Sequence, residues 1–412
     1  MKLLTLLLAV ICCAGLQVSK AGDVWTEQKT SAPDGGDNTW YGSAAAVLGS
    51  DAVIGADGDQ SFTGAAYVLR KDSGEWSQVL KLVPDDAAHG DSFGYRAALS
   101  DAIAVVTSYT ASPNGNTSQG AAYIFSHDGS WTQEQKLLAA DGIAFDSFGA
   151  SVAVDGPAVY VGANGATVDG NAAQGALYEF TLSAGTWAQA QKITADDGIA
   201  FDNFGFSVAV SNGTMFIGAP SAAIDGTPGQ GAVYVYIADN GEWTQVQKLT
   251  SADANSFGAF GESVAFDGTT LIVGASGASA AYAFAFDGTA WTQAQKFSGS
   301  DTAAGDNFGS TVALSGNELL VSGDIATVDG STSRGAAYLF THTEGIWMQE
   351  HKFVASDGTV DDFFGAAMAF DGPTAILASP HPTIDGHPWQ GAAYFYSRDG
   401  VFADGFDGPS PL

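Results

Sequence analysis

The sequence predicts an all-β fold, a seven-bladed β-propeller whose blades are four-stranded antiparallel sheets. A unit of 48 to 56 residues recurs seven times along the chain, and each unit holds apolar runs of strand length separated by turns. Repeats of this size built from four strands are typical of propeller blades. In addition, the first such run after the N-terminal segment, Trp25-Thr26-Glu27-Gln28-Lys29, has the pattern of a fourth strand without the three that should precede it.

The stretch from Phe148 to Thr194 shows the unit most clearly. It contains four apolar runs, and Asp155-Gly156 separates the first run from the second. Asp-Gly favours the positive φ values of a tight hairpin. Ala184-Gly185-Thr186 has the same place between the third run and the fourth. One unit is therefore predicted to be a small antiparallel meander.

Aligning the units shows which positions recur. Each begins with an aromatic residue followed by glycine, at Tyr41, Phe93, Phe148, Phe204, Phe260, Phe308 and Phe364. An alanine always follows five residues later, at Ala46, Ala98, Ala153, Ala209, Ala265, Ala313 and Ala369. The fourth run starts with tryptophan and mostly continues as Trp-x-Gln-x-Gln-Lys. Alanine in the first run and tryptophan in the last suit strands that are crowded at an axis and spread out at the rim.

The two ends of the repeat region predict that the ring closes. The unit that begins at Phe364 has three runs and no Trp-led fourth run. We expect the segment 24–30 to supply that missing strand, which would remove the open sheet edges between the first and last blades. The propeller would then span residues 22–399 and be a monomer. Its seven blades would start near residues 41, 93, 148, 204, 260, 308 and 364.

These motifs are those of a known repeat. The aromatic-Gly pair followed by Gly-Ala, with an intact Gly218-Ala219-Pro220, resembles the FG-GAP repeat of integrin α-subunit propellers and of secreted FG-GAP proteins. The resemblance implies a β-propeller that binds or adheres rather than catalyses. Integrin-type repeats often carry an Asp-x-Asp-x-Asp-Gly calcium loop between FG and GAP. Here that interval is a tight turn such as Asp155-Gly156, so calcium binding at those loops is not transferred.

The N-terminal segment is predicted to be a signal peptide, residues 1–21. Lys2 precedes a short apolar stretch, and Ser19-Lys20-Ala21 fits a cleavage site. We therefore expect a secreted or cell-surface protein, or a periplasmic one in a bacterium. Both cysteines, Cys12 and Cys13, fall in this segment, with lipid attachment through Cys13 as an alternative. Residues 400–412 are polar and are predicted to form a loose tail.

The chain is strongly acidic, which limits its partners. Lys and Arg number 14 against 45 Asp and Glu, giving a formal net charge of −31. Such a surface repels phosphate, so we expect no nucleic-acid binding and no membrane insertion. Half of the cations are one recurring lysine of the fourth run, which we expect to be solvated at the rim. They are Lys29, Lys81, Lys136, Lys192, Lys248, Lys296 and Lys352.

Aspartates recur in the connectors between units. One stands seven residues before each aromatic, at Asp34, Asp86, Asp141, Asp197, Asp253, Asp301 and Asp357. A second stands two residues before it in five units, at Asp91, Asp146, Asp202, Asp306 and Asp362. Paired carboxylates suit a hard cation, and Asp141, Asp146, Asp197 and Asp202 are candidate Ca²⁺ ligands. Recurrence in every unit favours instead a structural role, with each Asp bonded to amides of its own turn, so no cofactor is predicted.

The loops between the second and third strands supply the candidate binding residues. The loop of the last unit is the most unusual: it contains His381, Asp385, His387 and Trp389, of which Trp389 could stack on a sugar ring. Trp40 is the other tryptophan outside the strand pattern, and Tyr109 replaces the usual residue after Gly-Ala in the second unit. Solvated histidines are the alternative interpretation of this loop, because no metal-ligand spacing is present.

The predicted function is non-enzymatic recognition of an extracellular protein or glycan by the acidic loop face of the propeller. The sequence has no nucleophile elbow, phosphate loop or Ser/His/Asp set. Two alternatives remain. One is a structural protein of the envelope or extracellular matrix. The other is a glycan-active hydrolase or lyase, because a propeller can bring distant carboxylates together at its axis.

Overall fold

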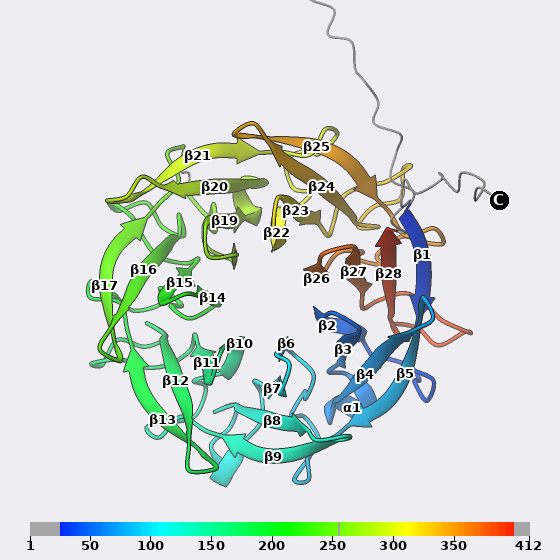
Figure 1. Ribbon diagram of the computed structural model, residues 1–412, viewed down its shortest axis with the longest axis horizontal. Helices are drawn as coiled ribbons and strands as arrows, with labels where there is room; N and C mark the ends of the chain where they lie inside the picture. Colours follow the sequence, from blue (N-terminus) through cyan, green and yellow to red (C-terminus); the bar gives the residue numbers. More distant parts are fainter. Residues whose placement is uncertain (1–24, 254–255, 399–412) are drawn as a thin grey trace, which may run out of the picture.

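A computed structural model describes residues 25–253 and 256–398, and these form one ring of seven four-stranded antiparallel sheets (Figure 1). The propeller prediction is confirmed. The proposed signal peptide, both cysteines and the predicted tail lie outside the described residues.

Each blade runs outward from the axis of the ring, strand by strand. The innermost strands are β2 (Tyr41–Leu48), β6 (Ala97–Leu99), β10 (Phe148–Asp155), β14 (Ser207–Ser211), β18 (Ser263–Phe266), β22 (Phe308–Ser315) and β26 (Ala367–Asp371). The second strands are β3 (Asp51–Ala56), β7 (Ile103–Ser108), β11 (Ala158–Ala163), β15 (Thr214–Ala219), β19 (Thr270–Ala275), β23 (Glu318–Gly323) and β27 (Thr374–Ser379). We number the blades 1 to 7 from β2 to β26.

The third strands are β4 (Ala65–Asp72), β8 (Ala121–His127), β12 (Ala176–Ser183), β16 (Ala232–Asp239), β20 (Ala280–Phe286), β24 (Ala336–Thr343) and β28 (Ala392–Arg398). The outer strands are β5 (Glu75–Leu82), β9 (Trp131–Leu137), β13 (Thr186–Ile193), β17 (Glu242–Leu249), β21 (Trp291–Phe297), β25 (Ile346–Phe353) and β1 (Trp25–Thr30). Short helical turns occur only in loops of the described chain, at α1 (Asp59–Phe62), η1 (Pro113–Gly115) and η2 (Ser276–Ala278).

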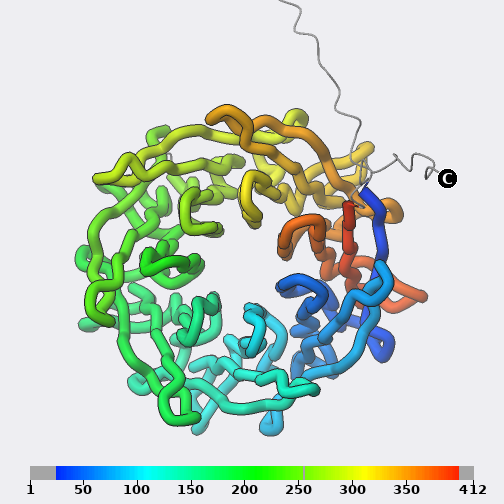
Figure 2. Tube along the Cα trace, viewed as in Figure 1, coloured from blue at the N-terminus to red at the C-terminus, as the bar shows by residue number. Residues whose placement is uncertain are grey.

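The N-terminal strand closes the ring as expected. Strand β1 pairs antiparallel with β28, from Trp25 opposite Arg398 to Thr30 opposite Ala393. Figure 2 shows the first segment of the described chain lying against the last. Because the first and last strands share a sheet, blade 7 has the same four-stranded construction as the others and the ring has no gap.

The hydrophobic cores lie between neighbouring blades. One core combines Val105 of blade 2 with Val161 and Trp187 of blade 3. The outer-strand tryptophan packs on the preceding blade: the Trp243 and Tyr160 rings lie 5.8 Å apart, and those of Trp76 and Phe395 lie 4.9 Å apart. The recurring tyrosine of each third strand is fully buried. These aromatics are therefore structural.

The two glutamines of the Trp-x-Gln-x-Gln-Lys motif connect neighbouring blades. Gln135 exchanges two hydrogen bonds with the backbone of Trp187 in the next blade, at 2.7 and 2.9 Å. The first glutamine of the motif reaches the other way: Gln189 accepts a bond from the amide of Ala140, in the connector from the preceding blade. Repetition of this motif thus holds the outer circumference together.

Candidate functional site

The connectors between blades and the loops between second and third strands lie on one side of the ring, which we call the loop face. Hydrogen bonds join the two kinds of segment: the amides of Phe145, Phe201 and Asp361 donate to carbonyl groups in the loop of the preceding blade. Paired strands also place the start of every inner strand at this side. A ligand on the loop face therefore meets connectors, loops and the mouth of the axial channel together.

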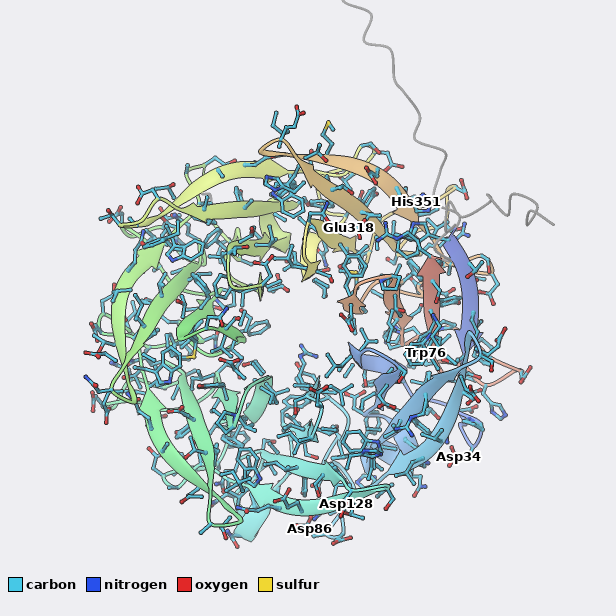
Figure 3. The ribbon with its side chains drawn as sticks, viewed as in Figure 1. Asp34, Trp76, Asp86, Asp128, Glu318 and His351 are labelled. Carbon is cyan, nitrogen blue, oxygen red and sulfur yellow. The ribbon has the colours of Figure 1, made fainter. Side chains whose placement is uncertain are left out.

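The first connector aspartate of each blade belongs to a repeated Lys-Asp-Tyr arrangement. The lysine of the outer strand lies 2.5 to 2.8 Å from this carboxylate in six blades, and Lys296 contacts Asp253 in the seventh. In five blades the buried tyrosine also donates a hydrogen bond to the same aspartate, as Tyr178 does to Asp141 at 2.9 Å. Figure 3 labels two of these aspartates, Asp34 and Asp86, which lie at the outer circumference of the ring.

These contacts differ from the expected environment of the lysines. They are paired with aspartates and only 18 to 43 % exposed rather than freely solvated, because the connector of each blade runs beside its own outer strand. Burial raises the pKa of Asp141, but hydrogen bonds from Lys192 and Tyr178 outweigh that effect and lower it overall. The arrangement fixes each connector to its blade.

The second connector aspartate caps its own turn. Asp146 accepts a hydrogen bond from the amide of Ile143 at 2.8 Å, and Asp202 accepts one from Ile199 at 2.9 Å. Both carboxylates are buried. Among the described residues no group of three or more His, Cys, Asp or Glu side chains could hold a metal ion. Asp141 and Asp197, the other two candidate Ca²⁺ ligands, have lysine partners instead.

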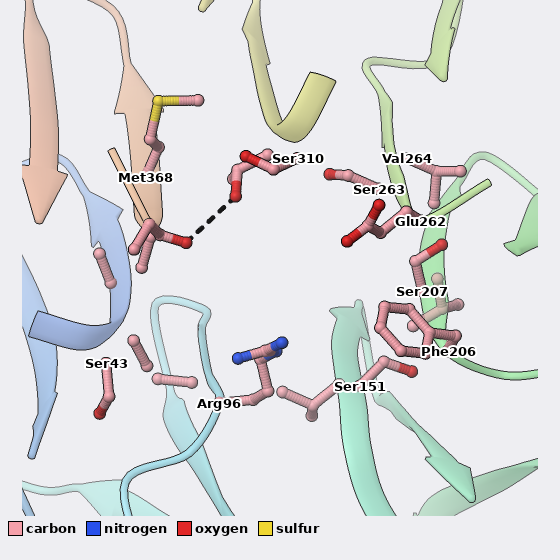
Figure 4. A pocket seen from close by; sticks show the side chains of 18 of the residues that line it. Ser43, Arg96, Ser151, Phe206, Ser207, Glu262, Ser263, Val264, Ser310 and Met368 are labelled. Carbon is pink, nitrogen blue, oxygen red and sulfur yellow. Dashed lines mark hydrogen bonds between the residues drawn. The ribbon is translucent and has the colours of Figure 1, made fainter. Parts of the chain in front are cut away.

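The axial channel contains a polar cavity of about 360 Å³ at its loop-face end. It is lined by the first residues of all seven inner strands, and most of these are serine, threonine or alanine. The charged lining residues are Arg96 and Glu262, each just before an inner strand, and Asp324, which follows β23. Figure 4 shows the Arg96 guanidinium and the Glu262 carboxylate directed into the cavity from opposite sides.

The carboxyl groups of the cavity are shielded from solvent. Burial raises the pKa of Glu262, although its carboxylate accepts a hydrogen bond from Ser276. Burial likewise raises the pKa of Asp324. Asp57, which follows β3 and is not among the residues that line the cavity, is 6 % exposed, and burial raises its pKa to about 6. Together with Arg96, Glu262 and Asp324 offer hydrogen-bond donors and acceptors to a polar ligand in the cavity.

Arg96 takes the place of a residue that elsewhere links neighbouring blades. Ser151 and Ser207 stand at the same position in blades 3 and 4, and each donates a hydrogen bond of 2.8 Å to a glycine carbonyl of the next blade. In blade 2 the hydroxyl group of Thr107 makes the corresponding bond to Gly149. The second strand thus supplies the blade contact, which leaves the Arg96 side chain directed into the cavity.

The structure brings together three of the residues predicted to bind a ligand. The His381 ring lies 5.9 Å from Trp40, in the connector from blade 7 to blade 1, and 5.7 Å from Trp389 in its own loop. Phe62 and Phe363 pack on Trp40 and His381, at 5.0 and 4.7 Å. We call these five residues the aromatic cluster. Trp389 remains 49 % exposed, so the cluster presents an indole ring to solvent.

The remaining predicted binding residues are not members of the aromatic cluster. His387 bonds to Asp37 at 2.9 Å, and Asp385 lies in a left-handed turn of the same exposed loop. Tyr109 stacks on Tyr95 with ring centroids 3.8 Å apart, and the Arg96 guanidinium lies 4.2 Å from the Tyr95 ring. Tyr109 therefore belongs to the surroundings of the axial cavity.

Sequence comparison identifies the repeat. The family model described as FG-GAP repeat matches residues 76–125, 131–180, 187–236, 243–285, 291–340 and 347–396. The chain belongs to the FG-GAP repeat family. Each matched segment begins with an outer strand and continues through three strands of the next blade, so the family unit is offset from the structural blade. No curated protein matches the FG-GAP chain. Its described residues include no helix long and apolar enough to span a membrane.

Sequence reasoning did not identify Arg96, Glu262, Asp324 or Asp57. The sequence does single out Arg96, because the equivalent residue in each of the other repeats is Ser, Thr or Ala. Asp57 and Asp324 similarly follow the second strand where Pro220 stands in the intact Gly-Ala-Pro motif. The charged residues near the mouth of the axial channel are therefore positions at which a unit differs from the repeat.

Proposed function

We propose that this FG-GAP protein is a secreted or cell-surface, monomeric binding module that recognises a protein or glycan through its loop face, without catalysis. The aromatic cluster is the observation that carries the proposal. Its members come from the loops of blades 1 and 7 and from the connectors that lead into these two blades, so the closed ring is needed to assemble it. A half-exposed tryptophan on such a support is the kind of residue that dominates binding interfaces.

The backbone around the cluster supports a role of its tryptophans in recognition. Trp389 and Trp40 both have positive φ, 55° and 54°, a conformation that large side chains rarely adopt. Backbone hydrogen bonds hold this geometry, because the Trp40 amide donates to the Trp389 carbonyl at 3.0 Å. A rigid aromatic side chain loses little entropy when it binds, which favours affinity. The predicted signal peptide supports an extracellular location.

Arrays of extracellular proteins and glycans, screened with and without Ca²⁺, test the proposal. We expect the mature protein to bind at least one ligand, and Trp389→Ala to weaken that binding at least thirtyfold, about 2 kcal/mol. Asp385→Ala reports on the rest of the loop, and Met348→Ala on the outer strand β25 is the matched control for an exposed apolar side chain. Absence of any ligand, or equal binding by the Trp389 variant, would count against the proposal.

A further inference from the structure

Three phenylalanines occupy equivalent and unusual positions on the loop face. Phe145, Phe201 and Phe257 each lie three residues before the aromatic-Gly pair, in the connectors that lead into blades 3, 4 and 5. Their amides donate to the carbonyl groups of Thr117, Ala172 and Pro228 in the preceding loop, at 2.8, 2.9 and 3.0 Å. The three side chains therefore stand at matching places on consecutive blades, and we call them the phenylalanine arc.

The backbone at these positions is unsuited to phenylalanine. The φ angles are 70°, 69° and 60°, in the left-handed region that favours glycine, asparagine and aspartate. The equivalent residues of the other four blades are of those three types, namely Asn38, Gly90, Gly305 and Asp361, all with positive φ. Phenylalanine thus introduces backbone strain that four other blades avoid.

Packing does not explain these residues. The three phenylalanines are 68 %, 65 % and 70 % exposed, the largest exposures among the large apolar side chains of the described chain. Ile143 and Ile199, two residues before the first two phenylalanines, are also more than half exposed. Strained and solvent-exposed apolar residues that stabilise no core indicate a surface made for contact.

Charge indicates what kind of partner would cover this surface. Between Leu137 and Phe297 the only cations are Lys192, Lys248 and Lys296, against fifteen Asp and Glu. All three lysines are bound to connector aspartates at the outer circumference. Asp169 and Asp225, at the tips of the loops of blades 3 and 4, are both exposed. An acidic surface with apolar projections is complementary to basic and aliphatic side chains.

We propose that the phenylalanine arc docks a protein partner through a segment that presents alternating basic and aliphatic side chains. The inference rests on the proposed binding function and specifies the chemistry of a partner. Aliphatic side chains of the segment would pack on Phe145, Phe201 and Phe257, and its basic groups would face the carboxylates of the neighbouring loops. A second copy of this acidic chain does not fit, because like charges repel across an interface.

Synthetic peptides test this chemistry on the intact mature protein. The probe is the octapeptide Lys-Leu-Lys-Leu-Lys-Leu-Lys-Leu, compared with the same peptide carrying Ser for Leu or Glu for Lys. Fluorescence anisotropy should detect binding of the Lys-Leu peptide alone. The triple variant Phe145→Asn, Phe201→Asn, Phe257→Asn should weaken it at least tenfold. Replacing the exposed outer-strand residues Val79, Val246 and Met348 by Thr is the matched control and should leave affinity unchanged.

Thermal melting separates a binding role from a structural one. Asparagine tolerates positive φ, so the triple variant should melt at or above the temperature of the unaltered protein. A large fall in melting temperature, unchanged affinity for the Lys-Leu peptide, or equal binding of the Glu-Leu peptide would each overturn the proposal. Arc-dependent binding to phosphatidylcholine vesicles, or arc-dependent dimers in sedimentation, would overturn it in favour of a membrane or a second copy.

The outcomes are distinguishable from failure of the general binding function. Suppose that Trp389→Ala weakens binding of an array ligand, while the arc variants change neither the affinity for that ligand nor the affinity for the Lys-Leu peptide. Only the arc proposal then fails. If the arrays yield no ligand while the peptide binds through the arc, the proposed role of the aromatic cluster fails instead.

Discussion

Replacing Asp57 by Asn should stabilise the protein at neutral pH, because burial opposes ionisation of this carboxyl group. The folded-state pKa of Asp57 is raised to about 6 from 3.8. One oxygen of the carboxyl group is buried with no hydrogen-bond partner. Between these two pH values the folded protein holds a proton that the unfolded chain has released. The free energy of unfolding therefore falls as the pH rises from about 4 to 6.

The size of the effect follows from the difference between the two pKa values. At about 1.4 kcal/mol per unit, ionised Asp57 lowers the free energy of unfolding by about 3 kcal/mol above pH 6. An entropy of unfolding of about 0.8 kcal/mol/K for a chain of this length converts this to about 4 °C in melting temperature. Asp57→Asn should raise the melting temperature by up to about this amount at pH 7.5, and much less at pH 4.

Calorimetry of the variant and the unaltered protein across pH 4 to 8 measures this difference. Asp169→Asn is the control, because this aspartate stands at a loop tip on the surface and should change little at any pH. A difference that did not depend on pH, or a variant less stable than the unaltered protein at pH 7.5, would refute the reasoning.

Three further predictions concern the ring itself. Asp141→Ala removes the partner of Lys192 and of a buried tyrosine hydroxyl, and urea titration should show that the free energy of unfolding falls by about 1–2 kcal/mol. Because the folded-state pKa of Asp141 is lowered, this difference should be present above pH 3.8 and should shrink in more acidic solution. Thr107→Val leaves the Gly149 carbonyl without its buried hydrogen-bond donor and should lower the free energy of unfolding by about 1–3 kcal/mol. Thr107→Ser keeps the hydroxyl donor and should retain most of this stability. Removing β1 exposes the edge of β28, so sedimentation should reveal concentration-dependent association that the full ring does not show.

Sequence alone predicts most of the architecture, because the residues that define a blade recur at equivalent positions in seven units. Glycine at turns, alanine near the axis and tryptophan at the rim each satisfy a local requirement, and together they indicate a blade. The unpaired run at Trp25 indicates closure by the same reasoning. The contacts of the Gln and Lys residues were not predictable, because their partners lie in a neighbouring blade or a connector whose position depends on the ring.

The candidate site is less accessible to sequence reasoning. Trp40, His381 and Trp389 were identified because they stand outside the strand pattern, but their proximity depends on the junction between blades 7 and 1. The left-handed conformation of Phe201 contradicts the preference of phenylalanine, so no local pattern could predict it. Only a comparison with Gly90 and Asn38 at the equivalent position would have indicated that the backbone at Phe201 is left-handed. The residues that we propose to bind a partner are those that depart from what the fold requires.

Hydroxyl-radical footprinting of the protein with its array ligand bound tests the central claim most directly. Trp389 on the loop face and Met348 on β25 are both about half exposed, and both side chains react readily, so the two sites report on different parts of one molecule. We predict that the ligand protects Trp389 from oxidation and leaves Met348 unchanged. Protection of Met348 with full oxidation of Trp389 would contradict the assignment of the loop face as the binding surface.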